Sequence, residues 1–271
     1  MFRGPESGTK TTLSILACVK YLERFPTMNA IYLDVEDKFD PSLIKRFGID
    51  VKRFIIPIIE NAEKTIDYID KILRKPRTGI LVVDSLAALC PQIEIDASAE
   101  DQQQGVAARE LNKLMRKTIS AMKAGYIHRG WSPTVIFINQ ERYKIGSWGN
   151  PITIPGGEGQ KYLVSLILRL RTLKPGKEDH IPEDAPLAKV AASVVKHNFG
   201  KVMIMGVEYF FAMKDYKNLK AGEAMDTEFL WRMAQKMNLV DEVGSQGELE
   251  RRGEFYHQLK KVFCETLERE E

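Results

Sequence analysis

The stretch Gly4–Leu13 reads GPESGTKTTL and lies where a short apolar strand would turn into a helix. It nearly satisfies G-x-x-x-x-G-K-[ST], the pattern of loops that cradle phosphates at a helix N-terminus. Lys10 stands where a lysine reaches the β- and γ-phosphates, and Thr11 where a hydroxyl can bind Mg²⁺. The glycine expected before the lysine is Thr9, which restricts the backbone there. The stretch predicts a nucleotide site of altered geometry; the alternative is an ordinary glycine-rich turn.

Two acidic segments would complete such a site. The apolar run ILVVDS leads to Asp84, where a carboxylate at the end of a buried strand can hold Mg²⁺ directly or through water. In IYLDVEDKFD, Glu36 lies just beyond another apolar strand, on the side where open α/β sheets bind ligands. Glu36 could therefore polarise an attacking water, with Asp34 and Asp37 as rival bases. A plain surface role for any one of these acids is the alternative.

Apolar strands alternate with amphipathic helices from residue 10 onward, as is typical of a mostly parallel sheet with helices on both faces. Strands are expected at Ala30–Asp34, Phe54–Ile56, Ile80–Val83 and Thr134–Asn139. Helices are expected at Thr11–Arg24, Glu63–Arg74 and about Glu100–Ala124. These elements predict an α/β fold.

The pattern changes beyond residue 160, where strands joined by short loops are expected to extend the sheet antiparallel. These strands cover Val164–Arg171, Ala188–Val195 and Val202–Phe211. Two helical stretches follow, at Thr227–Met237 and Gly253–Glu268. We therefore expect one α/β core over residues 1–211 and a small C-terminal helical lobe over residues 212–271.

The composition limits the class of protein. The formal net charge is only +3, so nucleic-acid binding requires locally clustered Lys and Arg. Cys18, Cys90 and Cys264 form no CxxC pair, which argues against a zinc site and a disulfide framework. No apolar run approaches the roughly 20 residues that span a bilayer, and the N-terminus lacks the apolar segment of a signal peptide. We expect a soluble, cytoplasmic protein with no membrane partner.

The expected helix at Glu100–Ala124 separates apolar from basic side chains when its residues are placed about 100° apart. The apolar face holds Ala108, Leu111, Leu114, Met115, Ile119 and Met122. The opposite face holds Arg109, Lys113, Arg116 and Lys117. We expect the first face to pack and the second to be free for phosphates; a merely solvated basic face is the alternative.

Polar segments of weak periodicity flank this helix, at Asp96–Gly105 and Gln140–Gly157. The second, QERYKIGSWGNPITIPGG, combines cations, aromatic residues and paired glycines, which suit stacking among unpaired bases and contact with their backbone. Its relevant residues are Arg142, Tyr143, Lys144, Trp148, Gly156 and Gly157. Long loops of this kind are more often functional than filler. Gln140, at the end of the preceding strand, is placed to pass the nucleotide state into the loop.

Six segments of the chain resemble the RecA recombinase family, in the family's order and at nearly its spacing. They are GPESGTKTT, LDVEDKFDPSLIKRFGID, ILVVDSLAAL, GVAARELNKLMRK, IFINQERYKIGSWGNP and PGGEGQKY. The Asn-Gln step, followed by a basic loop, Gly-Asn-Pro and Gly-Gly, distinguishes this family from other phosphate-loop ATPases. The resemblance covers most of residues 1 to about 210 and implies a RecA-like phosphate-loop ATPase core.

The resemblance implies that the first site binds ATP and Mg²⁺. Glu36 would be the catalytic base and Gln140 the sensor of the γ-phosphate. Thr11 and Asp84 would manage Mg²⁺, and Asp40 would neighbour the adenine. The implied nucleotide-binding residues are Gly4, Pro5, Glu6, Ser7, Gly8, Thr9, Lys10, Thr11, Thr12, Asp40 and Asp84.

The same likeness implies two loops that bind single-stranded DNA, at about Glu94–Gln104 and Glu141–Gly157. Arg109 and Arg116 would contact backbone phosphates. The other residues placed near DNA are Gly105, Arg142, Lys144, Trp148, Gly156 and Gly157.

In this family, ATP lies between neighbouring subunits of a helical filament, and lysines of the next subunit reach across to the phosphates. Lys161 and Lys196 occupy those positions, so the resemblance implies that they act in catalysis on the neighbour's nucleotide. The second lysine of the family's Lys-Asn-Lys motif is here Asn198, so one of these cations is missing and catalysis is expected to weaken.

Further departures concern the start and the middle of the chain. Thr9 and about six extra residues around Tyr126–Pro133 favour a phage-encoded member, which would act in the cytoplasm of a bacterial host. The family carries an N-terminal helix and strand that dock on the adjacent subunit, whereas three residues precede Gly4 here. The likeness is also looser in the C-terminal region.

Three functions fit these observations. The first is an ATPase that binds single-stranded DNA and, as a filament, promotes pairing and strand exchange with homologous duplex DNA. The second is a catalytically impaired regulatory protein that binds nucleotide and DNA, because of Thr9, Asn198 and the missing N-terminal elements. A third function, a hexameric helicase motor of the same core fold, is less well supported, because no helicase accessory domain fits in 271 residues.

Overall fold

The computed structural model describes residues 1–96, 105–143, 152–157, 159–174, 186–198, 206–214 and 224–225. The chain divides into two compact units, of residues 1–171 with 192–205 and of residues 172–191 with 206–271. The two predicted C-terminal helices, Thr227–Met237 and Gly253–Glu268, lie outside the described residues. The helical lobe and the boundary at residue 211 stay predictions.

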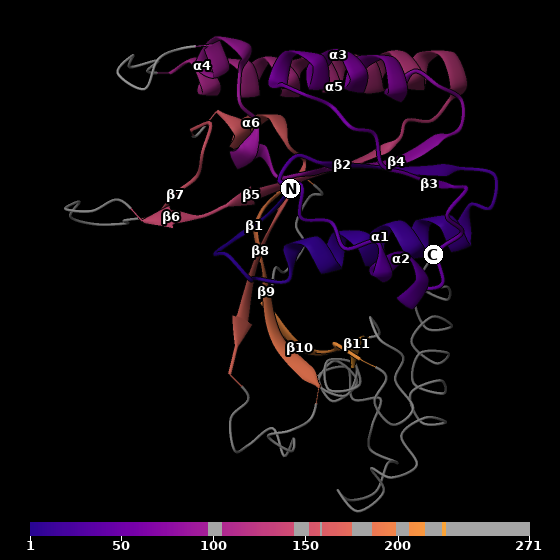
Figure 1. Cartoon of the computed structure of the whole chain (residues 1–271), viewed down its shortest axis with the longest axis vertical. Helices are drawn as coiled ribbons and strands as arrows, with labels where there is room; N and C mark the ends of the chain where they lie inside the picture. The colour runs from indigo at the N-terminus through magenta and orange to yellow at the C-terminus, as the bar shows by residue number, and fades with distance from the viewer. Residues whose placement is uncertain are drawn as a thin grey trace, which may run out of the picture. The chain divides into compact units, whose positions relative to one another are not determined.

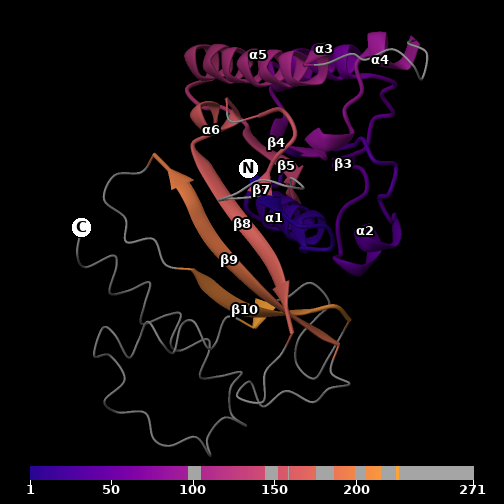
Figure 2. The ribbon, with the colours of Figure 1, turned by 90° about the vertical axis from the view of Figure 1, so that its left-hand side faces the viewer.

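A mostly parallel sheet forms the centre of the first unit, in the strand order β9-β8-β1-β5-β4-β2-β3 (Figure 1). Of β8 and β9, this unit holds the residues up to Arg171 and from Ala192 onward. Its strands are β1 (Phe2–Gly4), β2 (Asn29–Asp34), β3 (Phe54–Ile55), β4 (Thr78–Asp84), β5 (Thr134–Gln140), β8 (Leu166–Leu173) and β9 (Leu187–His197). The pairs from β8 through β1, β5, β4 and β2 to β3 are all parallel, which confirms the predicted sheet. The expected antiparallel extension is wrong for its first strand, because β8 pairs parallel with β1. The change of direction comes one strand later, since the arrow of β9 points opposite to that of β8 (Figure 2).

Strand β4 shows why the sequence forms a sheet with two covered faces. All seven of its residues are buried, and it lies between β2 and β5. A strand covered on both sides reads as a continuous apolar run instead of an alternating one. The strand exceeds the predicted Ile80–Val83 because Thr78 and Asp84 also pair with β2. This extension carries Asp84 to the end of the strand.

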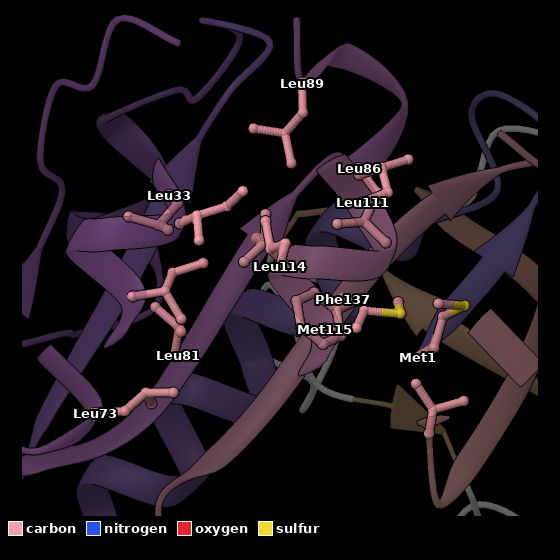
Figure 3. Close-up of a cluster of buried hydrophobic side chains, with 14 of the residues drawn as sticks. Met1, Leu33, Leu73, Leu81, Leu86, Leu89, Leu111, Leu114, Met115 and Phe137 are labelled. Carbon is pink, nitrogen blue, oxygen red and sulfur yellow. The ribbon is translucent and has the colours of Figure 1, made fainter. Parts of the chain in front are cut away.

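Helices cover both faces of this sheet (Figure 1). One face carries α1 (Lys10–Arg24) and α2 (Ser42–Arg46), and the other carries α3 (Ala62–Leu73), α4 (Gln92–Asp96), α5 (Val106–Arg129) and α6 (Gln160–Leu163). Successive strand residues point to opposite faces, so Tyr32 joins the core under α1 while Leu33 joins the core under α3 and α5. Figure 3 shows the second core, in which Leu33 and Leu81 meet Leu114 and Phe137.

Helix α5 differs from the prediction at both ends and at one buried position. It begins at Val106 and not near Glu100, because Gly105 before it adopts the left-handed conformation. It continues beyond Ala124 to Arg129 and ends at Gly130, whose φ of 76° suits glycine. Leu111, Leu114 and Met115 are buried as predicted. Ile119 is 41% exposed, so its predicted place on the packed face is wrong. The buried stripe instead passes through Thr118 and Ala121.

In the second unit, β10 (Val207–Ala212) pairs antiparallel with β11 (Ala224–Met225). The predicted strand Val202–Phe211 thus begins at Val207 in the described part of the chain. No helix within the described ranges is long and apolar enough to cross a membrane.

Candidate functional site

The predicted phosphate loop connects the end of β1 to the first turn of α1. A Cβ atom at Gly4 would overlap the carbonyl oxygen of Leu170 on β8, so only glycine fits where the loop begins. The backbone N–H of Glu141 donates to Gly4 O at 2.9 Å, which joins the loop to the residue after β5. The loop therefore starts from a fixed point between two neighbouring strands.

Thr9 adopts the left-handed conformation, with φ of 59° and ψ of 13°. This is the backbone region for which the phosphate-loop pattern supplies glycine, and a β-branched residue adopts it at a cost of about 1–2 kcal/mol. The Thr9 hydroxyl donates to Gly8 O at 2.7 Å and does not cap α1. The loop thus keeps the conformation that glycine would favour, in spite of the substitution.

Lys10 is 7% exposed and lies inside this loop. Its ammonium donates to Pro5 O at 2.5 Å. Burial lowers the pKa of Lys10, while the carboxylates of Asp84, Glu36 and Glu141 oppose that shift. A phosphate in the loop would offer this buried cation a stronger acceptor than a carbonyl oxygen.

Asp84 receives two short hydrogen bonds at the end of β4. Thr11 Oγ1 and Tyr32 OH each donate to Asp84 Oδ2 at 2.6 Å. Burial raises the pKa of Asp84, and these two hydrogen bonds partly offset the rise. A hydroxyl and a carboxylate in contact are oxygen ligands of the kind that Mg²⁺ prefers, so Thr11 and Asp84 fit the ion. The described residues hold no cluster of three His, Cys, Asp or Glu. Mg²⁺ usually completes its coordination with waters and substrate phosphates.

Glu36 is the acid that the structure brings into contact with the end of β5. Gln140 Nε2 donates to Glu36 Oε1 at 2.7 Å, and Ser85 Oγ donates to the same oxygen at 2.5 Å. Lys38 Nζ lies 3.0 Å from Glu36 Oε2. Burial alone would raise the pKa of Glu36, but the hydrogen bonds from Ser85 and Lys38 and the charges of Lys38 and Lys10 bring it below its ordinary value. Glu36 is therefore ionised at neutral pH.

The rival acids have other surroundings. Asp34 Oδ2 accepts from the backbone N–H of Phe39 at 2.7 Å and so braces the turn after β2. Asp37 is exposed, with a φ of 53°. Asp40, predicted near the adenine, is exposed and accepts from both the backbone and the hydroxyl of Ser42. Of the three candidate bases, Glu36 alone contacts Gln140 among the described residues.

The predicted second DNA loop is anchored at both ends. It opens as β6 (Arg142–Tyr143), which pairs antiparallel with β7 (Ile152–Thr153). Near its other end, the buried Asn139 amide donates to Pro155 O at 3.1 Å and to Gln160 Oε1 at 2.9 Å. A Cβ at Gly156 would overlap the Gln160 amide, so this glycine permits close packing over α6. The loop is thus tied to the same strand end that carries Gln140.

Comparison with known proteins agrees with this geometry. The sequence profile of the RecA N-terminal domain matches residues 1–207. The chain belongs to the RecA family. Protein RecA of Mesomycoplasma hyopneumoniae is 38% identical over 173 residues, which are 63% of this chain and 49% of that protein. Protein RecA of Thermus thermophilus is 33% identical over 195 residues, which are 72% and 54% of the two chains. The chain spans about half the length of these relatives.

The basic face of α5 in this RecA-family chain borders a hollow of about 520 Å³. The hollow is lined by Arg109, Glu110, Asn112, Lys113, Arg116 and Leu163. Arg109 and Arg116 are exposed there, as predicted for phosphate contacts. Two cations predicted to be free on this face are paired instead. Lys117 pairs with Asp67 of α3 at 2.9 Å, and Lys113 pairs with Glu110 at 3.2 Å. The cations available at this face are therefore fewer than the sequence indicated.

The two lysines predicted to act on a neighbouring subunit's nucleotide lie close together. Lys196 Nζ donates to Lys161 O and to Val164 O, so its ammonium caps the last carbonyls of α6 within this chain. For Lys196 to reach a neighbour's phosphate, it would have to exchange these partners.

Several predicted DNA-binding residues lie outside the described residues, namely Lys144, Trp148 and most of the first loop. Gly105 precedes α5 in the left-handed conformation, and Gly157 also has a positive φ, of 72°. Sequence reasoning missed Tyr32, Ser85, Asn139, Gln160 and the pair of Glu141 with Arg169. The polar character of residues at a strand end could have drawn attention to Ser85, Asn139 and Glu141. Tyr32 and Arg169 lie inside strands and Gln160 begins α6, so no such signal marks them.

Proposed function

We propose that this chain is an ATP-dependent recombinase that binds single-stranded DNA and, as a helical filament, promotes its pairing and strand exchange with homologous duplex DNA. The single observation that carries the proposal is the hydrogen bond from Gln140 to Glu36. It joins the residue placed to activate water to the strand end from which the second loop departs.

In the proposed reaction, ATP lies in the loop Gly4–Thr11, and Lys10 turns from Pro5 O to a phosphate oxygen. Thr11 and Asp84 would hold Mg²⁺, which draws charge from the phosphate oxygens when bound. Glu36 is ionised and accepts a proton from the attacking water. Loss of the γ-phosphate changes the surroundings of Gln140, and the change passes into the loop that begins at Glu141.

DNA would be held beside the basic face of α5 and the hairpin of β6 and β7. Arg109 and Arg116 are proposed to contact phosphates, because they are exposed along the hollow beside α5. The loop residues proposed to contact bases and backbone are Gly105, Arg142, Lys144, Trp148, Gly156 and Gly157. Filament neighbours would supply Lys161 and Lys196 to the nucleotide.

A second function, a catalytically impaired regulatory protein that binds nucleotide and DNA, is favoured by two observations. Thr9 holds a conformation suited to glycine, and Asn198 replaces a cation of the family motif. ATP turnover separates the two proposals, since only the recombinase needs rapid hydrolysis. A phage origin and a cytoplasmic location in the host also stay predictions.

The test is the rate of ATP hydrolysis with and without single-stranded oligonucleotide, measured for the unaltered chain, Lys10→Ala and Lys20→Ala. Lys20 is a matched control because it lies on the exposed face of α1 and pairs with Glu23. We expect DNA-stimulated hydrolysis in the unaltered chain and in Lys20→Ala, and none in Lys10→Ala. Equal turnover in Lys10→Ala would refute the site, and turnover absent from the unaltered chain would favour the regulatory protein.

Electron microscopy with an ATP analogue and single-stranded DNA tests the assembly. Filaments are expected. Rings would favour a helicase-like motor, and monomers would contradict the proposal that lysines of one subunit act on the nucleotide of the next.

A further inference from the structure

Three charged side chains meet directly beside the phosphate loop, two from the neighbouring strands β1 and β8 and one from the residue that follows β5. Arg169 of β8 donates from Nε and Nη2 to Glu141 Oε2, at 3.0 and 2.8 Å. Arg3 of β1 approaches the other carboxylate oxygen, with its Nε 3.4 Å from Glu141 Oε1. The Glu141 side chain is only 3% exposed. Arg3 and Arg169 are half-buried, with side chains 14% and 22% exposed. Within the described residues, Arg3 Nε and Glu141 Oε1 make no hydrogen bond, so Arg3 acts by charge alone. We call Arg3, Glu141 and Arg169 the buried triad, after its buried carboxylate.

The strand register explains why this carboxylate is needed. Arg3 and Arg169 are register partners on the parallel strands β1 and β8. Two like charges at neighbouring positions of a sheet repel each other, and Glu141 inserts a negative charge between them. The buried triad thus joins β8, β1 and the end of β5 through a single carboxylate.

Glu141 also occupies a critical place along the chain. It directly follows Gln140, which contacts Glu36, and directly precedes Arg142, where the hairpin of β6 and β7 begins. Its own backbone N–H donates to Gly4 O at the start of the phosphate loop. One residue therefore connects the phosphate loop, the sensor of the nucleotide state and the root of the second loop.

Stability alone does not account for the buried triad. Burying charges costs desolvation free energy, and well-packed apolar residues often give equal or greater stability. What paired charges can add is a fixed relative position of the elements that carry them. The charge of Glu141 also acts on Lys10, because it opposes the lowering of the Lys10 pKa by burial.

We propose that Glu141 is a positioning residue, clamped by Arg169 and Arg3, that transmits the nucleotide state from the phosphate loop to the second DNA loop. This inference rests on the proposed function. When the contacts of Arg169 and Arg3 with Glu141 are removed, nucleotide still binds at Lys10, Thr11 and Asp84. DNA binding by the loop after Glu141, however, no longer depends on whether nucleotide is bound.

The experiment measures the affinity for a labelled single-stranded oligonucleotide with and without a slowly hydrolysed ATP analogue. The ratio of the two dissociation constants is the coupling factor, and such factors are commonly about 5 to 150. For Arg169→Met we expect the coupling factor to fall by about fivefold or more, while the dissociation constant of the analogue stays within about twofold. A role in folding alone would weaken nucleotide and DNA binding together.

Two further variants complete the test. Lys64→Met, on α3, breaks the exposed pair with Glu60, which precedes that helix, and is expected to leave the coupling factor unchanged. Arg169→Lys keeps the charge but offers a single ammonium in place of the two guanidinium donors. It is expected to keep part of the coupling, and it can be measured if Arg169→Met does not fold.

The outcomes separate the inference from the function on which it rests. If the unaltered chain binds DNA equally well with and without nucleotide, the proposed function is wrong, and the inference fails with it. An unaltered chain that responds to nucleotide, together with Arg169→Met or Arg169→Lys that responds equally, would overturn only the role of the buried triad.

Discussion

Removal of the Tyr32 hydroxyl tests how the candidate Mg²⁺ site is held. Tyr32 is 1% exposed, and its hydroxyl donates to Asp84 Oδ2 at 2.6 Å. Its ring packs against Phe39 and Phe54, with centroids 5.0 and 5.9 Å away. Tyr32→Phe keeps this ring packing and removes the hydroxyl, which also hydrogen-bonds with the side chain of Ser14. The pH dependence of the loss of stability therefore reports the bond to the Asp84 carboxylate.

The expected loss follows from the charge of the acceptor. A hydrogen bond to a charged group contributes about 1.5–3 kcal/mol, so the free energy of unfolding should fall by about that amount at pH 8. For a chain of this size each kcal/mol shifts the melting temperature by about 2–4 °C, which gives a decrease of about 3–12 °C.

The loss should depend on pH, because the hydrogen bond from Tyr32 lowers the pKa of Asp84 while burial raises it. Without that hydrogen bond, the pKa of Asp84 in the folded variant rises further. The folded variant then binds a proton that the unaltered folded chain has released, so its stability decreases more steeply as pH rises. At a pH low enough to protonate Asp84 in both proteins, the variant lacks only a hydrogen bond between neutral groups. Its free energy of unfolding should then be lower than that of the unaltered chain by about 0.5–1.5 kcal/mol.

The assay is urea unfolding of the nucleotide-free protein across a pH series. Tyr126→Phe, which removes the hydroxyl of a tyrosine that is 61% exposed, is the control and should leave stability unchanged. A loss in Tyr32→Phe that is the same at every pH, or no loss at pH 8, would refute the reasoning.

Three further predictions concern the loop, the base and the DNA contacts. Thr9→Gly should raise the free energy of unfolding in urea by up to about 1.6 kcal/mol, because relief of about 1–2 kcal/mol of strain outweighs about 0.4–1 kcal/mol of added unfolded-state entropy. A decrease would contradict the strain at φ 59°. Glu36→Gln should slow ATP hydrolysis by about 10²–10⁴-fold. Because the pKa of Glu36 is lowered, hydrolysis by the unaltered chain should persist as pH falls below the ordinary pKa of glutamate. A rate of hydrolysis unchanged by the substitution would exclude Glu36 as the base. Replacing Arg142, Lys144 and Trp148 together by alanine should weaken binding to single-stranded DNA and reduce the salt slope by about 1.4, from two lost cations at about 0.7 each; an unchanged slope in a salt titration would count against this loop.

Much of the fold was predictable because it follows from local patterns. The apolar run before Asp84 predicts a strand buried on both faces, and β4 is one. The phosphate-loop pattern placed the first turn of α1 within one residue of Lys10. Ile119 shows where prediction of burial from helical periodicity fails. Spacing residues at about 100° identifies the apolar face of α5, but it does not show how much of that face α3 and the sheet cover.

The sequence by itself determined the order of strands and helices, the phosphate loop and the residue types at the strand ends, because each is set by neighbours along the chain. Only the tertiary structure decided which polar groups meet. Tyr32 reaches Asp84 across 52 residues, and Gln140 reaches Glu36 across 104. Arg169 contacts Glu141 because β8 and β5 lie on either side of β1 in the sheet. Such contacts depend on strand order and register, and neither leaves a periodic signal in the sequence.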